Sequence, residues 1–177
     1  MLYNKVTYKK LQIVNKLFIL KLKIFLDLNS NEIIGIPLES FPTKDIDDQH
    51  INGKLTVIWR DWDKILPGEP KMIYVSSVSP NEIKGPHLHL KRISYFVCIK
   101  GKVIFIIKDN DGNYHEIESD ENNPTLVQIP KNIPSAHINL SKDSSTILAF
   151  TDISWKPNDN EMINVKFDDY DWNKWKK

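Results

Sequence analysis

Two histidines, His87 and His89, stand two residues apart in a run typical of a β-strand. Successive side chains of a strand point to opposite faces, so both imidazoles share one face while Leu88 and Leu90 occupy the other. The preceding sequence Lys84-Gly85-Pro86 predicts a bend, which places the pair near one end of the strand. Because an imidazole exchanges protons near neutral pH, such a pair can act as acid or base, or bind a ligand.

The other histidines and the neighbouring basic residues carry weaker signals. A single buried histidine is more often structural than catalytic, but a pair followed by Lys91 and Arg92 leaves both interpretations open. We expect Lys91 on the same face as the two imidazoles. His50 and His115 lie in polar, loop-like sequence, which favours a structural role. His137 precedes an apolar run and is an intermediate case.

Short apolar runs separated by turn sequences must position these side chains. The runs expected to form strands are residues 34–36, 55–59, 71–78, 94–99, 102–108, 114–118, 125–129 and 146–151. The turn sequences are Asn52-Gly53, Pro67-Gly68, Lys100-Gly101, Asn110-Asp111-Gly112-Asn113 (a strong hairpin signal) and Asn122-Asn123-Pro124. Residues 61–65 predict a helical turn, and Trp172 and Trp175 predict a short docking helix. Many short strands with regular turns indicate an all-β sandwich or barrel.

The composition is that of an ordinary globular domain. The 177 residues are 41% hydrophobic and 27% charged, which is one domain's length with enough apolar surface for a core. The 24 basic and 23 acidic residues give a net charge of +1, so the chain has no basic footprint for nucleic acid. Cys98 is the single cysteine and lies in an apolar run, so we expect a buried thiol and a reducing, cytoplasmic setting.

The segment Leu17–Leu28 is apolar but is interrupted by Lys21 and Lys23. No uncharged window reaches the ~20 residues of a transmembrane helix, and no signal-peptide pattern is present. We expect one or two strands here, added to a partner's sheet in a homodimer, or else a poorly ordered extension. The alternative dimer interface is the face that carries Leu88 and Leu90.

The motif Gly85-x-His87-x-His89, followed by Gly101 after an apolar strand, resembles the first conserved motif of the cupins. With Tyr74 thirteen residues before His87, it more narrowly resembles the RmlC-like nucleotide-sugar branch. That branch includes dTDP-4-dehydrorhamnose 3,5-epimerases and dTDP-sugar 3,4-ketoisomerases. Residues 128–134 are similar to the second cupin motif, and Thr151-Asp152 matches the ending strand of the epimerases.

This resemblance covers roughly residues 34–157 and implies a fold. The expected fold class is all-β, a cupin-type jelly-roll β-barrel or sandwich with short terminal extensions. We expect an N-terminal extension or interface strand at 1–30, a cupin domain at 31–157, and a tail at 158–177 that docks on the barrel.

The metal-binding cupin pattern is incomplete in this chain. That pattern has a carboxylate five residues after the second histidine and another histidine in the second motif. Ser94 and Ser135 occupy those positions, with His137 as a shifted candidate. We therefore predict neither a bound metal nor a cofactor.

The two enzyme patterns of the nucleotide-sugar branch fit unequally. The base histidine of the epimerases maps onto His87, but their companion lysine maps onto Ser94 and their acid tyrosine onto Leu148. The ketoisomerase pattern matches at His87, His89 and Tyr74. Moving a ketone to the neighbouring carbon passes through an enediol, and one or two imidazoles can shuttle the proton along the same side of the sugar.

The leading hypothesis is an isomerase or epimerase of a nucleotide-linked, dTDP-type 4-keto-6-deoxy sugar, in deoxysugar and glycan precursor biosynthesis. His87 is the predicted base, with His89 or Tyr74 relaying the proton. Lys91 or Arg92 would stabilise the enediolate oxygen or bind the diphosphate. The predicted substrate-binding residues are Lys84, Lys91, Arg92, Tyr95, Ser135 and His137. Two alternatives stay open: a non-catalytic cupin that binds a sugar or nucleotide, and a metal-dependent cupin enzyme such as a dioxygenase.

Overall fold

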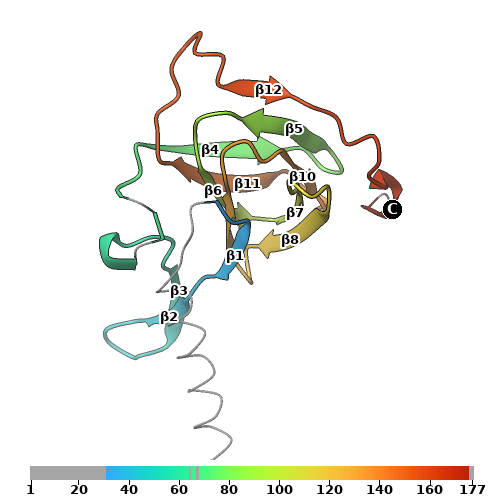
Figure 1. Ribbon diagram of the computed structural model, residues 1–177. Coiled ribbons are helices and arrows are strands. Elements are labelled where there is room, and N and C mark those ends of the chain that lie inside the picture. Colours follow the sequence, from blue (N-terminus) through green and yellow to red (C-terminus); the bar gives the residue numbers. More distant parts are fainter. Residues whose placement is uncertain (1–30, 64, 67, 176–177) are drawn as a thin grey trace, which may run out of the picture.

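Two antiparallel sheets pack face to face in the computed structural model, which describes residues 31–63, 65–66 and 68–175 (Figure 1). The first sheet has the order β1 (Ile34–Pro37), β9 (Thr125–Ile129), β6 (Ser94–Lys100), β11 (Ser145–Thr151) and β4 (Met72–Val78). The second sheet has the order β12 (Met162–Asn164), β5 (Ile83–His89), β10 (Ser135–Asn139), β7 (Lys102–Lys108) and β8 (Tyr114–Asp120). The predicted all-β, cupin-type jelly roll is confirmed.

Apolar side chains from both sheets fill the space between them. Phe105 and Ile107 of β7 meet Val127 of β9 and Ile147 of β11 in one buried cluster. Since these side chains come from strands of both sheets, burying them holds the two layers together. Phe105 of this cluster also lies against His137 of β10, with ring centroids 5.4 Å apart.

The outer faces of both sheets are covered in part. On the first sheet, Tyr95 and Phe150 pack against Leu66 and form a second cluster. On the second sheet, the C-terminal tail with the short 3-10 turn η2 (Trp172–Trp175) packs against Ile104 and Ile106. Strands covered on both faces need apolar residues at nearly every position, which explains the continuous run of β7.

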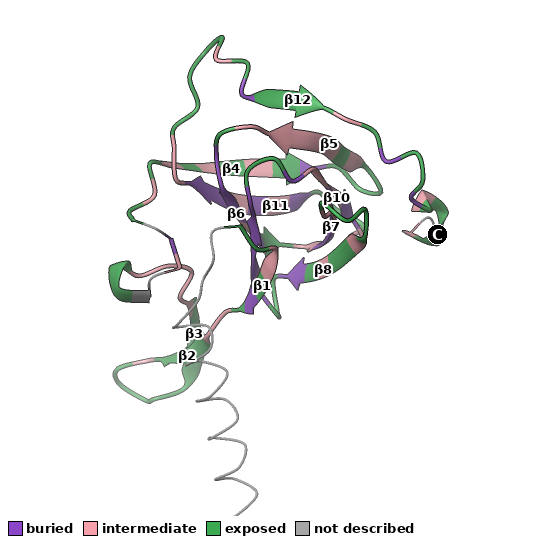
Figure 2. Ribbon diagram, viewed as in Figure 1, coloured by how far each residue is buried: buried purple, intermediate pink, exposed green. Residues whose placement is uncertain are grey.

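A third pair of strands lies outside the two sheets. β2 (Ser40–Lys44) and β3 (Ile51–Thr56) form a hairpin that projects from the barrel and is exposed over almost all of its length (Figure 2). A strand was predicted at 55–59, and a turn was predicted at Asn52-Gly53. Both predictions are wrong, because the strand ends at Thr56 and the Asn-Gly pair lies within β3. The hairpin turns at residues 45–50 instead, where Asp45 accepts a backbone hydrogen bond.

Most other predicted elements are confirmed. The strands at 102–108 and 125–129 have the expected bounds, and the hairpin between β7 and β8 turns at 109–113. The helical turn is the 3-10 segment η1 (Asp61–Asp63), which is shorter than expected. Among the described residues, no helix is long and apolar enough to cross a membrane. The predicted strand at Leu17–Leu28 lies outside the described residues.

Candidate active site

Strand β5 presents His87 and His89 between two neighbouring strands of the second sheet. His87 lies opposite Ser135 of β10 on one side and Asn164 of β12 on the other. His89 lies opposite Met162 of β12. The two histidines are therefore held in a strand that is paired on both edges, which restricts the positions of their side chains.

The predicted bend at Lys84-Gly85-Pro86 lies inside β5 rather than before it. Gly85 has φ +93°, a conformation that side-chain-bearing residues rarely adopt. A Cβ at Gly85 would lie 2.9 Å from the backbone oxygen of Ser135. The pairing of β5 with β10 also shifts register between Ser135 and His137, so that His137 lies opposite Lys84. Glycine at position 85 thus permits the close approach that brings both strands to the site.

A hydrogen bond to the C-terminal strand orients the ring of His87. Its Nδ1 lies 2.9 Å from Oδ1 of Asn164. An amide oxygen only accepts hydrogen bonds, so Nδ1 carries the proton and donates. In the neutral ring, Nε2 then keeps its lone pair and is available to take a proton from a substrate.

His89 is held between two charged groups. Its Nδ1 donates to Oε2 of Glu161 at 3.0 Å, and Nη2 of Arg92 donates to its Nε2 at 3.0 Å. Burial is the largest cause that lowers the pKa of His89 below its ordinary value; the nearby Arg92 cation lowers it further, and Glu161 opposes both. His89 is therefore a neutral ring with both nitrogens occupied.

The charged partners of His89 are deeply buried. Glu161 is 2% exposed and Arg92 is 8% exposed, and Nε of Arg92 lies 3.6 Å from Oε2 of Glu161. Within the described part of the chain, Oε1 of Glu161 and Nε of Arg92 are buried without a hydrogen-bond partner. Buried polar atoms usually find partners, so these two mark a place where a ligand group or water can complete the site.

Tyr74 reaches the same region from the first sheet. It alternates along β4 with Ile73 and Val75, which are exposed, so its side chain points to the opposite face. Burial is the main cause that raises the pKa of Tyr74; the Arg92 cation lowers it and the Glu161 carboxylate raises it. The phenol therefore lies within electrostatic range of both buried charges and stays protonated at neutral pH.

Lys84 links the two sheets beside the histidines. Its Nζ donates to Oγ of Ser76, the next residue along β4 on the face of Tyr74, at 2.5 Å. His137 lies opposite Lys84 and close to the rings of Phe96 and Phe105, with centroid distances of 6.3 and 5.4 Å. Burial, and then the charges of Lys84 and His87, lower the pKa of His137 to about 3. His137 is consequently a neutral ring at any pH near 7.

The structure brings most, but not all, of the predicted site residues together. Lys91 does not share the histidine face: β5 ends at His89, so strand alternation stops there, and Lys91 is exposed. Tyr95 is fully buried and stacks on Phe150 with centroids 5.2 Å apart, in the cluster on the outer face of the first sheet. The residues gathered around β5 are Tyr74, Lys84, His87, His89, Arg92, Ser135 and His137.

Two further residues that contact the histidines, Glu161 and Asn164, had no signal in the sequence. Asn164 is the last residue of β12 and Glu161 immediately precedes the strand, in a segment that we did not predict to be a strand. Their three-residue spacing matches no motif that we used. We call Tyr74, His87, His89, Arg92, Glu161 and Asn164 the histidine cluster.

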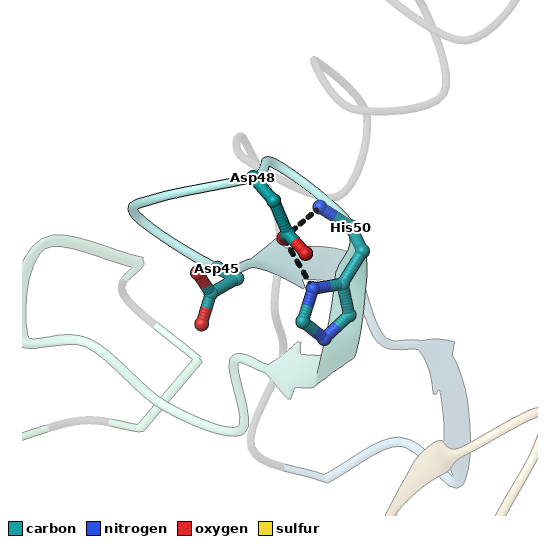
Figure 3. A group of neighbouring side chains, drawn as sticks. All are labelled: Asp45, Asp48 and His50. Atoms are coloured by element: carbon teal, nitrogen blue, oxygen red, sulfur yellow. Dashed lines mark hydrogen bonds and ion pairs between the residues drawn. The ribbon is translucent and has the colours of Figure 1, made fainter.

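A separate group of potential metal ligands lies on the hairpin. Asp45, Asp48 and His50 are the one group of three or more His, Cys, Asp and Glu residues, among those described, whose ligand atoms lie within 4.8 Å of one another (Figure 3). Asp48 already accepts hydrogen bonds from the backbone and the ring of His50. These bonds lower the pKa of Asp48 and account for the geometry of the turn.

Known structures with this fold include enzymes of sugar nucleotides. A dTDP sugar isomerase from Desulfovibrio desulfuricans matches with TM-score 0.66 and 18% identity, over 80% of this chain and 89% of that one. A dTDP-4-dehydrorhamnose 3,5-epimerase from Sulfolobus tokodaii matches with TM-score 0.66 and 17% identity, over 82% and 83%. QdtA, a sugar 3,4-ketoisomerase from Thermoanaerobacterium thermosaccharolyticum in complex with TDP, matches with TM-score 0.59 and 18% identity, over 81% and 90%.

Other relatives are longer, and this chain matches only part of them. It spans 27% of the capsular polysaccharide assembling protein CapF from Staphylococcus aureus, with TM-score 0.52 and 17% identity over 55% of this chain. No curated protein sequence matches significantly. Residues 36–170, most of the described chain, match the family described as FdtA: WxcM-like, C-terminal. The protein therefore belongs to the WxcM-like, C-terminal (FdtA) family.

Proposed function

We propose that this protein is an isomerase or epimerase of a nucleotide-linked 4-keto-6-deoxy sugar, with dTDP as the nucleotide, in deoxysugar and glycan precursor biosynthesis. The observation that carries the proposal is the orientation of His87, whose Nδ1 donates to Asn164 and leaves the Nε2 lone pair as a base. The names of the structural relatives support the substrate class, since they act on dTDP sugars or bind TDP.

The proposed reaction moves a proton between neighbouring carbons. Nε2 of His87 takes the proton from the carbon next to the ketone, and the electron pair of that C–H bond forms the double bond of an enediolate. The charge on the former ketone oxygen is stabilised by the cations of Lys84 or Arg92. The phenol of Tyr74 relays the hydroxyl proton between the two oxygens. The N–H of His87 exchanges with solvent, and His87 then delivers a proton to the neighbouring carbon. No atom is gained or lost, as an isomerisation requires.

Ketone migration fits this site better than inversion at carbon. Inversion needs an acid opposite the base, and the epimerase pattern puts that acid at position 148. Leu148 cannot donate a proton, and it packs in the outer cluster of the first sheet. Ser94, at the position of the companion lysine, is 1% exposed and carries no charge. Transfer along one side of the sugar needs neither group, so we favour 3,4-ketoisomerisation.

The proposal is tested by proton exchange. The protein is incubated with dTDP-4-keto-6-deoxyglucose in D2O, and the sugar protons are followed by NMR. We expect deuterium at the carbon next to the ketone and a new keto isomer, with both lost in His87→Asn. Tight binding of the nucleotide sugar without exchange would overturn the proposal in favour of a non-catalytic cupin. Exchange that requires stoichiometric Fe, Mn, Ni or Zn in the purified protein would favour the metal-dependent alternative.

We also propose a cytoplasmic homodimer. β4 is the last strand of the first sheet, and its Ile73 and Val75 are 63% and 61% exposed. An apolar strand at a sheet edge favours association unless another chain covers it. The two interfaces expected from the sequence were Leu17–Leu28, outside the described residues, and the face of Leu88, which lies opposite Ile163 of β12. Light scattering at micromolar concentration should give twice the chain mass, and a monomer would overturn this proposal.

A further inference from the structure

Two polar side chains of β10, His137 and Asn139, lie on the same face of the strand but differ in their hydrogen bonds. Asn139 is fully buried, and its amide donates to the carbonyl of Val78 and accepts from the hydroxyl of Ser145. Nε2 of His137 is also buried, yet it has no hydrogen-bond partner in the part of the protein that the structure describes. The fold therefore depends on the amide of Asn139 but not on the imidazole of His137.

The surroundings of His137 are those of an apolar side chain. The rings of Phe96 and Phe105 lie beside it, with centroid distances of 6.3 and 5.4 Å, and Phe105 belongs to the cluster between the two sheets. A buried ring nitrogen without a partner lowers stability, whereas an apolar side chain in the same place does not. Polar residues that lower the stability of the fold are typical of functional sites.

One nitrogen of this ring is within reach of a ligand. Nε2 is buried, but the side chain as a whole is only partly buried, so a ligand can approach Nδ1. Lys84 lies opposite His137 and is exposed. Burial, followed by the Lys84 cation, lowers the pKa of His137, so the ring is neutral. The cation favours a lone pair on Nδ1 and a proton on Nε2, where the N–H can face the aromatic rings.

We propose that Lys84 and His137 together bind the 2-hydroxyl group of the sugar and make the protein selective for sugars that carry it. Lys84 has three N–H donors, of which Ser76 accepts one, and a second donates to the hydroxyl oxygen. The hydroxyl then donates to Nδ1 of His137. A ketone oxygen cannot donate, so only a hydroxyl satisfies both residues. This inference rests on the proposed function and narrows it, because it leaves Arg92 to stabilise the enediolate.

The proposed reaction indicates which hydroxyl this is. A 4-keto-6-deoxyhexose that is linked through C1 has hydroxyl groups at C2 and C3 only. The 3-hydroxyl becomes the new ketone and gives its proton to Tyr74. The 2-hydroxyl keeps its proton throughout, on the carbon next to the one that His87 deprotonates. The charge of His87 contributes to the lowered pKa of His137, so the two rings are neighbours and can reach adjacent carbons.

Binding of two unreactive sugar nucleotides tests this inference. dTDP-6-deoxyglucose and dTDP-2,6-dideoxyglucose differ only in the 2-hydroxyl, and neither has the ketone that the reaction needs. Calorimetry should show that the unmodified protein binds the first about tenfold more tightly, the usual effect of one hydrogen bond. His137→Leu should reduce this preference to less than about twofold, and His137→Gln should retain part of it because an amide oxygen still accepts. Equal affinities in the unmodified protein, or an undiminished preference in His137→Leu, would overturn the inference.

Two further measurements separate recognition of the sugar from a structural role. Ile147→Val shortens an apolar side chain of the cluster between the sheets and removes no hydrogen-bonding group, so it should keep the tenfold preference. His137→Leu should not lower the urea midpoint at pH 7, because Nε2 has no partner to lose. Its affinity for dTDP alone should change by less than about twofold. A lower midpoint together with weaker binding of dTDP would assign His137 a structural role and overturn the inference.

The tautomer of His137 provides a test without any ligand. The 15N NMR spectrum of the histidine rings at pH 7 should show the proton on Nε2 of His137, and a proton on Nδ1 would overturn the inference. Deuterium exchange tests the proposed function separately. A preference for the 2-hydroxyl without any exchange would support this inference and overturn the proposed function, and exchange without that preference would do the reverse.

Discussion

Nδ1 of His87 lies 2.9 Å from Oδ1 of Asn164, although the two residues are 77 positions apart in the chain. The contact exists because the three-residue strand β12 pairs with β5 at the edge of the second sheet. The candidate base is therefore oriented by the C-terminal part of the chain. A change that loosens the C-terminal part of the chain should therefore lower the reactivity of His87.

Substitution of Asn164 should act through the tautomer of His87. In Asn164→Ala, Nδ1 loses its partner and the proton distributes over both nitrogens, so the deuterium exchange rate should fall by about tenfold or more. Asn164→Asp should retain the Nδ1 proton, because a carboxylate also accepts, and should restore most of the rate near neutral pH. Asn173→Ala, at an exposed position of η2, is the control. Equal rates in the alanine and aspartate variants would contradict this prediction.

Docking of the tail should contribute to stability as well as to activity. Phe167 is 4% exposed and packs with Tyr170 against Ile104 and Ile106. Phe167→Ala should lower the free energy of unfolding by about 3 kcal/mol, measured by urea denaturation. Trp155→Ala removes an aromatic side chain that is 57% exposed, and it should change the free energy of unfolding by less than about 1 kcal/mol. A small effect of Phe167→Ala would mean that the tail is only loosely bound.

The lowered pKa of His137 should make stability depend on pH. Its folded pKa of about 3 lies below the ordinary histidine value, so the unfolded chain binds the additional proton between about pH 3 and 6.5. Stability is therefore complete above that range and is lost as the pH falls through it, by at most about 1.4 kcal/mol per pH unit for this group. The lowered pKa of His89 acts in the same direction.

Urea denaturation between pH 7 and 4.5 measures this dependence. His137→Gln removes the titrating ring and should flatten the slope. An unchanged slope in His137→Gln would show that the ring is charged or solvated in the folded protein.

Gly85 should resist substitution more strongly than a glycine in open space. Gly85 and Gly112 have similar φ angles, +93° and +86°, so alanine carries a similar backbone penalty at both, about 1–2 kcal/mol. A Cβ at Gly85 also meets the backbone oxygen of Ser135 at 2.9 Å, whereas nothing lies within 4 Å at Gly112. Gly85→Ala should therefore cost about 1–3 kcal/mol more than Gly112→Ala. Equal losses would contradict the close approach of β5 and β10.

Local patterns in the sequence predicted much of the fold and one half of the site. Alternation within a strand was enough to place His87 and His89 together, and the Asn110–Asn113 turn was enough for its hairpin. The same reasoning failed at Lys91, because alternation ends where the strand ends, at His89. The buried cation beside the two histidines is Arg92 rather than Lys91.

The other half of the site depends on contacts between distant segments. Asn164 alternates with the apolar Ile163 and Val165, but the run is short and we did not predict it to be a strand. Among the described strands, β12 pairs with β5 alone. Tyr95 lies away from the histidines for a related reason: its apolar strand is covered on both faces, and the sequence does not show which face meets the histidines. Contacts with neighbouring strands, rather than the propensity of the local sequence, determine where these residues lie.

Proton exchange in D2O tests the central claim most directly. Incubation of the protein with dTDP-4-keto-6-deoxyglucose should introduce deuterium at the carbon next to the ketone and produce the 3-keto isomer. His87→Asn should abolish both, although its binding of dTDP should persist. Absence of exchange in the unmodified protein, or undiminished exchange in His87→Asn, would contradict the assignment of His87 as the base.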